Sequence, residues 1–262
     1  SRHLSRSIKK IINFMTYKIK YINLAAQHNS IGHEIKREID SVFKNSAFIL
    51  RSNVLKFEQK ICKILNVKYC VSVNSGTDAL LFALSQAGLK KNDEVITPSF
   101  SYIATAGAVA ILGAEPVYVD IDPVTCNLDG VKLESVITSK TKAIIPVSLY
   151  GLPADFDLIN KVAKKYSIPV IEDGAQSFGA SYKGRKSCNL SLIGCTSFFP
   201  TKPLGCYGDG GAIFTSDSEL AKAIKKIARH GQEKKYYHTC IGMNSRLDTI
   251  QAAVLLAKID IL

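Results

Sequence analysis

Apolar positions follow two different spacings along the chain. In residues 30–50 and 53–65 they recur at the spacing of amphipathic helices, and in the first of these segments they are Ile31, Ile35, Ile39 and Phe43. From residue 69 onward, short apolar runs alternate with segments of helical spacing. The chain is therefore expected to begin with two helices and to continue as an alternation of strands and helices.

Seven apolar runs in the alternating part are expected to form strands. They cover residues 69–73, 94–97, 116–120, 142–148, 168–172, 195–199 and 211–215. Helices are expected between most of them, over residues 77–87, 102–112, 131–137, 156–166 and 218–230. This order predicts an α/β fold with a seven-stranded, mostly parallel sheet and helices on both faces. Such sheets bind ligands at the carboxyl ends of their strands, where we expect the functional residues.

Both ends of the sequence carry unusual patterns. Residues 1–14 precede Met15 and lack acidic residues, which fits a transit peptide or, as we favour, a non-native or dispensable leader of translated upstream sequence. A last helix is expected over residues 246–262, running apolar to its end without a stop signal. It would leave five apolar residues without cover: Leu255, Leu256, Ile259, Ile261 and Leu262. We therefore expect a chain cut in mid-helix, with a C-terminal segment missing.

Composition indicates a soluble enzyme-sized protein. The 262 residues are 47% hydrophobic, with a mean hydropathy of +0.09, and no apolar run approaches the roughly 20 residues that span a bilayer. The seven cysteines are odd in number, scattered and without a C-x-x-C pair. Zinc and a disulfide framework are therefore disfavoured. We expect a cytoplasmic protein with reduced thiols, without a metal and not attached to a membrane.

The net charge of +12 is unevenly placed. Residues 1–20 hold six basic residues and no acidic one, and the remaining excess is spread in short pairs such as Lys164-Lys165 and Lys234-Lys235. Aromatic residues do not interleave with the basic ones, so nucleic-acid binding has little support. A mildly basic enzyme would favour an anionic substrate.

A lysine lies between two prolines in the glycine-rich stretch of residues 194–211. An apolar run leads to Pro200, followed by Lys202 and Pro203, and the stretch ends in Gly-Asp-Gly-Gly. Prolines fix the backbone and glycines allow other groups to approach it closely. A lysine held in this way is suited to form a Schiff base with a cofactor carbonyl. An ordinary basic turn explains the stretch, taken alone, equally well.

Three other expected strand ends carry candidate groups. Residues 73–80 lead from a strand through Ser-Gly-Thr into a helix, which suits a phosphate or a plain helix N-cap. Asp173 ends a strand and could pair with the ring nitrogen of pyridoxal phosphate, or cap the next turn. An aromatic within residues 100–105 could stack on a flat ring or belong to the core. With Lys202, these groups together favour a pyridoxal-phosphate enzyme.

From about residue 22 to its end, the sequence resembles the DegT/DnrJ/StrS sugar aminotransferases, of the fold type I pyridoxal-phosphate class. The matching motifs are Ser-Gly-Thr (75–77), Asp-Glu-Val-Ile-Thr-Pro (93–98), Glu-Asp-Gly-Ala-Gln (172–176), Ser-Phe-Phe-Pro-Thr-Lys (197–202), Gly-Asp-Gly-Gly (208–211) and Gly-Met-Asn-Ser-Arg-Leu-Asp (242–248). The resemblance implies that Lys202 is catalytic, forming the internal aldimine and shuttling a proton. It further implies that Asp173 pairs with the pyridine nitrogen, Gln176 contacts the phenolic oxygen and Tyr102 stacks on the ring. The residues expected to hold the phosphate are Gly76, Thr77 and Ser197.

The resemblance also implies an assembly and a domain plan. The loop with Asn244, expected to bind cofactor, and Arg246, expected to bind substrate, reaches into the neighbouring subunit's site in the family, so a homodimer with composite sites is expected. The plan has a leader at 1–14, a helical segment at 15–68, a large cofactor domain at 69–240 and, at 241–262, the start of a linker helix to a truncated small domain.

The reaction implied by the resemblance moves an amino group from glutamate to a keto-sugar nucleotide. Residues 182–191 and 202–208 look like the branch acting on UDP-2-acetamido-2-deoxy-3-oxo-glucuronate, for bacterial surface (O-antigen-type, lipopolysaccharide) polysaccharide. Lys183, Arg185 and Lys186 are candidate anion contacts, or a solvated charge cluster. The alternatives are a TDP- or GDP-4-keto-6-deoxy sugar as substrate, a non-catalytic regulatory relative, and a dehydrating relative with histidine in place of lysine, against which Lys202 argues.

Overall fold

The computed structural model describes residues 22–261, so the leader expected at 1–14, and Leu262, lie outside the described residues. The chain divides into two compact units, Ser1–Gly32 and His33–Leu262. Helix α2 (Leu24–Lys44) begins in the first unit and ends in the second. The sheets, the three large clusters of buried apolar residues and the candidate site all lie in the second unit. No described helix is both long and apolar enough to cross a membrane.

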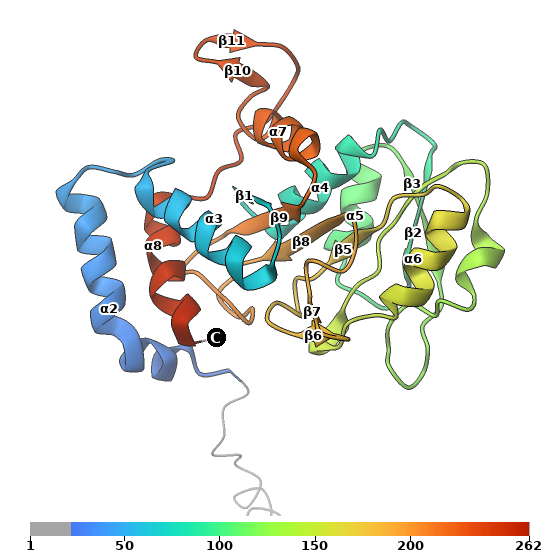
Figure 1. The fold of residues 1–262 in the computed structure, drawn as a ribbon, viewed down its shortest axis with the longest axis horizontal. Helices are drawn as coiled ribbons and strands as arrows, with labels where there is room; N and C mark the ends of the chain where they lie inside the picture. The colour runs from blue at the N-terminus through green and yellow to red at the C-terminus, as the bar shows by residue number, and fades with distance from the viewer. Residues whose placement is uncertain (1–21, 262) are drawn as a thin grey trace, which may run out of the picture. The chain divides into compact units, whose positions relative to one another are not determined.

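A strand forms at each of the seven positions that the apolar runs predict (Figure 1). These strands are β1 (Tyr69–Val73), β2 (Glu94–Pro98), β3 (Glu115–Val119), β4 (Thr141–Ile144), β5 (Ile171–Asp173), β8 (Ile193–Ser197) and β9 (Gly211–Thr215). Two short hairpins were not predicted: β6 (Ser181–Tyr182) with β7 (Arg185–Lys186), and β10 (Gln232–Lys234) with β11 (Tyr237–His238). The period of apolar residues thus located the strands of the two larger sheets and missed the two short hairpins.

The strands form two sheets where one was expected. One has the order β1-β9-β8-β5 and the other the order β3-β2-β4. Only isolated parallel bridges, Ile144 with Val170 and Val147 with Asp173, connect β4 to β5. The reason lies in Pro146 and Pro169, whose carbonyls accept hydrogen bonds from Asp173 and Ile144 at 3.0 and 3.1 Å but which have no N–H to donate. The pairs β2–β3, β2–β4 and β5–β8 are parallel, whereas β9 is antiparallel to both neighbours.

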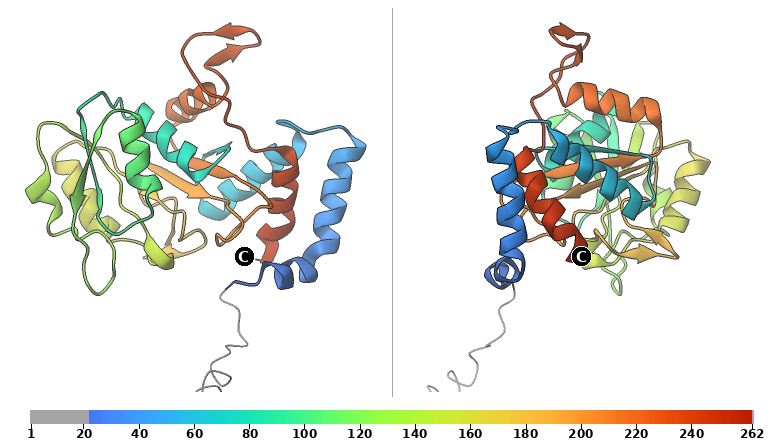
Figure 2. Two further views of the ribbon diagram at one scale, coloured as in Figure 1. Left: turned by 180° about the vertical axis from the view of Figure 1, so that it is seen from behind. Right: turned by 60° about the vertical axis from the view of Figure 1, so that its left-hand side comes forward.

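Helices cover both faces of these sheets. They are α3 (Ser52–Leu65), α4 (Gly76–Gln86), α5 (Ala104–Ile111), α6 (Phe156–Lys165), α7 (Ser218–Ile227) and α8 (Thr249–Lys258). Successive strand residues face opposite layers: Ile213 packs with α4, α5 and α7, while Ala212 and Phe214 pack with α3 and α8. Helix α6 covers the three-stranded sheet. Figures 1 and 2 show α3 and α8 on the side of β8 and β9 opposite α4.

The last helix, expected over residues 246–262, is corrected in its bounds and in part of its packing. Helix α8 ends at Lys258 and is followed by the 3₁₀ turn η3 (Ile259–Ile261), so a single helix does not run to the end of the described chain. Leu255 and Ile259, expected to lack cover, are buried in the cluster that α3 shares with α8. Helix α3, about 190 residues earlier in the chain, thus covers part of the expected apolar surface, whereas Ile261 is 53% exposed, as expected.

Two other helix predictions were also inaccurate. Helix α2 ends at Lys44 rather than near residue 50, since Ser46 and Leu50 have left-handed backbone angles (φ 47° and 51°) that end a helix. The helix expected over 131–137 is only the 3₁₀ turn η1 (Leu133–Val136).

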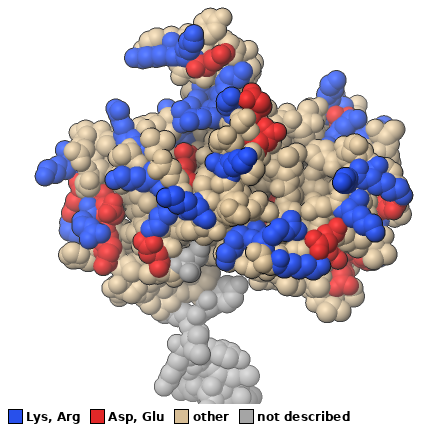
Figure 3. All heavy atoms as spheres, in the orientation of Figure 1, with Lys and Arg blue, Asp and Glu red and all other residues tan. Residues whose placement is uncertain are grey.

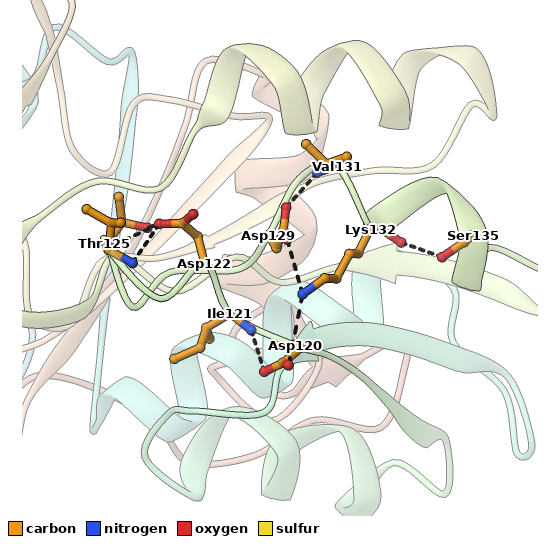
Figure 4. Close-up of polar contacts among 9 residues, drawn as sticks. Asp120, Ile121, Asp122, Thr125, Asp129, Val131, Lys132 and Ser135 are labelled. Atoms are coloured by element: carbon orange, nitrogen blue, oxygen red, sulfur yellow. Dashed lines mark hydrogen bonds and ion pairs between the residues drawn. The ribbon is translucent and has the colours of Figure 1, made fainter.

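Polar contacts fix the long connection before η1 (Figure 4). Asp122 Oδ1 accepts hydrogen bonds from the Thr125 N–H and Oγ1 at 2.8 and 3.0 Å, and these bonds hold the pKa of the Asp122 carboxyl below its usual value. Lys132 Nζ lies 3.3 Å from an oxygen of Asp129 and 3.9 Å from one of Asp120. The connection is therefore an ordered loop, and it presents the buried side chain of Asn127.

Candidate active site

A cavity of about 450 Å³ opens beside the start of α4, where β5 and β8 end. Most of its lining comes from four segments that are far apart in sequence: residues 75–77, 101–105, 173–176 and 195–202. These are the four stretches in which sequence analysis placed candidate groups. The carboxyl ends of the parallel strands bring them to one edge of the fold, as doubly wound sheets do.

Asp173 is a buried carboxylate in the wall of this cavity, with 7% of its surface exposed. Its Oδ2 accepts a 2.9 Å hydrogen bond from Thr105 Oγ1, and its Oδ1 accepts a 3.2 Å bond from the Ala175 N–H. Burial raises the pKa of Asp173, while these two bonds and the charge of Lys202 lower it. The net shift in pKa is upward because burial outweighs these contacts, so a cation bound beside Asp173 would stabilise its charged form.

The start of α4 forms a narrow cradle. Ser75 is the N-cap, and its Oγ accepts a 3.1 Å hydrogen bond from the Asp78 N–H. The amides of Gly76 and Thr77 belong to the first turn, whose N–H groups lack acceptors within the helix. A Cβ at Gly76 would lie 2.7 Å from Cβ of Ser197. The two interpretations of this stretch are therefore compatible: Ser75 caps the helix, and the next two amides remain available for an anion.

Lys202 lies in a closed turn after β8. Its N–H donates to the Phe199 carbonyl at 2.9 Å, and the Cys206 N–H donates to the Phe198 carbonyl at 2.8 Å. A Cβ at Gly205 would lie 2.3 Å from the Pro200 oxygen, so only glycine fits there. Lys202 is half-buried and lines the cavity.

Gln176 has its orientation set by a neighbouring turn. The Tyr150 N–H donates to Gln176 Oε1 at 2.8 Å, which identifies that atom as the acceptor and leaves the Nε2 amide as a donor at the cavity. Tyr150 lies in the 3₁₀ turn η2 (Leu149–Gly151) with φ 52°. A donor at this position can hold an anionic oxygen.

Asn127 is a residue of this region that sequence analysis missed. Its Oδ1 accepts from the Leu149 N–H at 3.0 Å, and its Nδ2 donates to the Leu152 carbonyl at 2.9 Å. The side chain thus bridges both ends of the turn that holds Gln176. Asparagine in an Asp-rich loop reads as an ordinary turn residue, so the sequence offered no separate signal.

Two aromatic side chains, those of Tyr102 and Phe199, line the cavity. Tyr102, 69% exposed, lines it, as does half-exposed Phe199. Phe100 and Tyr150 make an edge-to-face contact with ring centroids 6.4 Å apart. Tyr102 therefore presents a ring at the cavity rather than packing in the core.

Five candidate residues do not line the cavity: Asn244, Lys183, Arg185, Lys186 and Arg246. Lys183 and Arg185, on the hairpin β6–β7, form ion pairs with Asp157 at 2.6 and 3.2 Å. These side chains therefore form a solvated charge cluster, which was the alternative to a role as anion contacts. Figure 3 shows that lysine and arginine side chains on this face lie in separate groups among acidic ones.

The donor set of the cavity fits pyridoxal phosphate. The cradle at Gly76 suits a phosphate because the amides of the first turn of α4 lack acceptors within the helix. The absence of a side chain, which would collide with Ser197, leaves the backbone open to a close approach. Buried Asp173 suits a protonated ring nitrogen, Gln176 Nε2 a phenolic oxygen, and the Lys202 amine a carbonyl. Within the described part of the chain, the cavity thus brings together seven of the eight residues expected to bind the cofactor.

The model of the DegT/DnrJ/EryC1/StrS aminotransferase family matches residues 29–262. The chain is 59% identical, over 93% of its length and 68% of the relative, to the UDP-2-acetamido-2-deoxy-3-oxo-D-glucuronate aminotransferase of Pseudomonas aeruginosa. It is 47% identical, over 92% of its length and 64% of the relative, to a "pleiotropic regulatory protein" of Geobacillus stearothermophilus.

A solved structure of a DegT DnrJ EryC1 StrS aminotransferase from Brucella abortus superposes with a TM-score of 0.91 at 42% identity. The superposition covers 93% of this chain and 67% of that one. The chain thus spans about two thirds of the length of these relatives.

Proposed function

The chain belongs to the DegT/DnrJ/EryC1/StrS aminotransferase family, and on that basis we propose that it takes part in pyridoxal-phosphate-dependent transfer of an amino group from glutamate to a keto-sugar nucleotide. The observation that carries the proposal is the meeting of Lys202 and Asp173 in one cavity next to the Gly76 cradle. A reactive amine, a buried carboxylate and an anion cradle together are what this cofactor requires.

Pyridoxal phosphate, when bound, supplies a carbonyl for a lysine amine and a ring that delocalises an electron pair. The amides of Gly76 and Thr77 and the Ser197 hydroxyl would hold its phosphate. The carboxylate of Asp173 would keep the ring nitrogen protonated, and the ring of Tyr102 would stack on its face.

Two further residues act around the same ring. The Gln176 Nε2 group would donate to the phenolic oxygen. The Lys202 amine would bind the carbonyl and then carry a proton at the reacting carbon.

The proposed acceptor is UDP-2-acetamido-2-deoxy-3-oxo-glucuronate, an intermediate for surface polysaccharide. Its support is the 59% identity to an aminotransferase named for that substrate. Outside residues 1–20, which hold six basic residues and no acidic one, the chain is still net positive, and this charge favours an acceptor with a diphosphate and a carboxylate. The other acceptors, TDP- or GDP-4-keto-6-deoxy sugars, are the outcomes against which this substrate is tested.

A homodimer with composite sites belongs to the same proposal. Asn244 is exposed and, like Arg246, lies outside the cavity of its own chain, which is consistent with a role in a neighbour's site. We further propose a cofactor domain at 69–240, preceded by the segment 15–68 and followed by a linker from 241, and a cytoplasmic location. All seven cysteines are free in the structure, as a reducing compartment would keep them.

A second candidate is a regulatory relative that binds the cofactor without turnover. It is favoured by the 47% identity to a protein named as a pleiotropic regulator. Both candidates predict cofactor binding, and only the aminotransferase predicts exchange of amino groups.

Spectroscopy of the purified protein tests the cofactor. We expect a yellow protein whose absorption band disappears on borohydride reduction and is absent from Lys202→Ala. A protein that stays colourless with stoichiometric pyridoxal phosphate would contradict both candidates.

A substrate panel then separates the remaining possibilities. The protein is incubated with glutamate and with UDP-, TDP- and GDP-linked keto sugars, and amino sugars are detected by mass spectrometry. Transfer to the UDP-3-oxo-uronate is expected. Transfer only to a TDP-4-keto-6-deoxy sugar overturns the substrate but keeps the reaction, and cofactor binding without any transfer supports the regulatory candidate.

A further inference from the structure

Helix α8 points two polar side chains at the segment that follows Lys202. Gln251 and Lys258 are seven residues apart, about two helical turns, and therefore lie on one face of α8. Gln251 Oε1 accepts a 2.8 Å hydrogen bond from the Tyr207 N–H. Lys258 Nζ donates a 2.7 Å hydrogen bond to the Gly205 carbonyl. Both partners belong to residues 205–208, directly after the turn that presents Lys202.

Lys258 is an unusual residue for this place because it is buried, with 2% of its surface exposed. Its Nζ lies 4.4 Å from the centre of the Tyr207 ring, in a cation–π contact. Burial lowers the pKa of Lys258. No carboxylate within 4 Å balances its charge among the described residues. An apolar residue would fill the same core position without this penalty, so the contacts of the ammonium group are what distinguishes lysine from such a residue here.

The Lys202 turn is also closed at Phe198, the residue directly after β8. The Cys206 N–H and Sγ both donate to the Phe198 carbonyl, at 2.8 and 3.0 Å. Hydrogen bonds between Phe198 and Cys206 therefore close the turn. Side chains of α8 bind the residues on either side of Cys206, which are Gly205 and Tyr207. Lys202 lies between Phe198 and Cys206, and its N–H donates to the Phe199 carbonyl at 2.9 Å.

Helix α8 is itself a rigid support. Ala252 and Leu255 are fully buried in the cluster that α8 forms with α3, where Phe57 and Ile61 are also fully buried. A side chain anchored on this helix can transmit its position to the turn because the helix cannot easily move.

We propose that Lys258 and Gln251 are positioning residues for Lys202: they hold residues 205–208 against α8 and thereby fix the turn that aims the lysine amine into the cavity. The relevance of this support to catalysis rests on the proposed function. The support itself is a property of the cofactor-free chain, so it can be tested without the cofactor.

The test compares Lys258→Met, Lys258→Arg and Gln251→Met with the unchanged protein. Methionine matches the length of lysine without its charge or donor, and arginine retains both. Lys60→Met is the matched control, because Lys60 is paired with Asp260 at the surface and does not line the cavity. Hydrogen exchange of the peptide covering residues 199–208 is measured in the cofactor-free proteins, together with their thermal unfolding.

We expect about tenfold faster exchange of this peptide in Lys258→Met, near-normal exchange in Lys258→Arg, and an effect centred on residues 205–208 in Gln251→Met. The melting temperature of Lys258→Met should stay level or rise, because a buried charge is removed. Unchanged exchange in residues 199–208 overturns the proposal, as does faster exchange everywhere with a lower melting temperature. If Lys258→Met does not fold, the exchange and melting of Gln251→Met provide the test, and the same two results would overturn the proposal.

A second readout connects the support to the cofactor. On mixing cofactor-free protein with pyridoxal phosphate, the absorption band should form roughly tenfold more slowly in Lys258→Met and at the normal rate in Lys60→Met. If the unchanged protein forms no band, the proposed function fails, while the exchange measurement still decides whether α8 holds the turn.

Discussion

Thr105 donates a 2.9 Å hydrogen bond from Oγ1 to Oδ2 of Asp173, joining the start of α5 to the end of β5 inside the cavity wall. The hydroxyl of Ser101 lies 3.0 Å from the same Thr105 oxygen. This contact links two of the four segments that line the cavity, across 68 positions of sequence. It also acts against the burial that raises the pKa of Asp173.

Replacing Thr105 with valine tests this link. Thr105→Val removes the donor to a buried carboxylate, a contact worth about 1.5–3 kcal/mol, and we expect affinity for pyridoxal phosphate to fall about tenfold. Thr105→Ser retains the hydroxyl and should restore most of the affinity. Binding followed by absorbance provides the measurement, and unchanged affinity in Thr105→Val would show that Asp173 does not depend on this contact.

The pH dependence of stability should report the burial of Asp173. Because its pKa is raised in the folded protein, the folded carboxyl holds its proton more tightly than the unfolded one. The ordinary pKa of an aspartate carboxyl is 3.8. The free energy of unfolding therefore falls as the pH rises from this value through the raised pKa of the folded protein. Asparagine does not ionise, so cofactor-free Asp173→Asn does not lose this stability. At neutral pH it should have a higher melting temperature than the unchanged protein, and the difference in melting temperature should shrink as the pH is lowered.

The same substitution should reduce amino transfer by roughly a hundredfold or more, because the charge that holds the ring proton is lost. Melting curves over a pH series and rates with glutamate provide the two measurements. A stability difference that grows toward acid would contradict the burial effect.

Gly76→Ala tests the cradle at the start of α4. The added Cβ would lie 2.7 Å from Ser197 Cβ and 3.2 Å from Ser197 Cα, which pushes the helix start away from β8. We expect a loss of about 1–3 kcal/mol in unfolding free energy and at least tenfold weaker cofactor binding.

A second glycine in a helix provides the control for this variant. Gly107, inside α5, has no heavy atom within 4 Å of an added Cβ, so Gly107→Ala should be stabilising by about 0.5–1 kcal/mol. Calorimetry and cofactor titration distinguish the two. Equal behaviour of both variants would mean that the cradle is not close-packed in solution.

Asn127→Ala tests the turn that orients Gln176. The substitution removes two hydrogen bonds and leaves the buried Leu149 N–H without its acceptor, a loss of about 1–3 kcal/mol. Because the Tyr150 N–H of the same turn holds Gln176, cofactor affinity should fall as well.

Asn160→Ala is the matched control for Asn127→Ala. Asn160 donates one bond of 2.8 Å to the Leu190 carbonyl and does not line the cavity. It should cost about 1 kcal/mol of stability with normal cofactor affinity. Normal affinity in Asn127→Ala, despite a lower melting temperature, would confine Asn127 to a structural role.

The sequence was most informative where a single local rule decides the outcome. Buried strands such as β1 and β9 were located to the residue because apolar runs mark them. Lys202 and Asp173 were identified because each follows such a run at the carboxyl end of a strand. Boundaries that depend on backbone turns, such as the end of α2 at Lys44, were not found by the apolar period.

The four segments that supply most of the cavity lining were therefore determined by the sequence alone, because strand ends can be read from apolar runs, and amines, carboxylates and glycines carry their chemistry wherever they lie. Tertiary structure decided the rest. It covered Leu255 with α3, directed Lys183 and Arg185 to Asp157, and placed Lys258 beneath the Lys202 turn. These outcomes depend on partners distant in sequence, and no local pattern records which surface a side chain will meet when the chain folds.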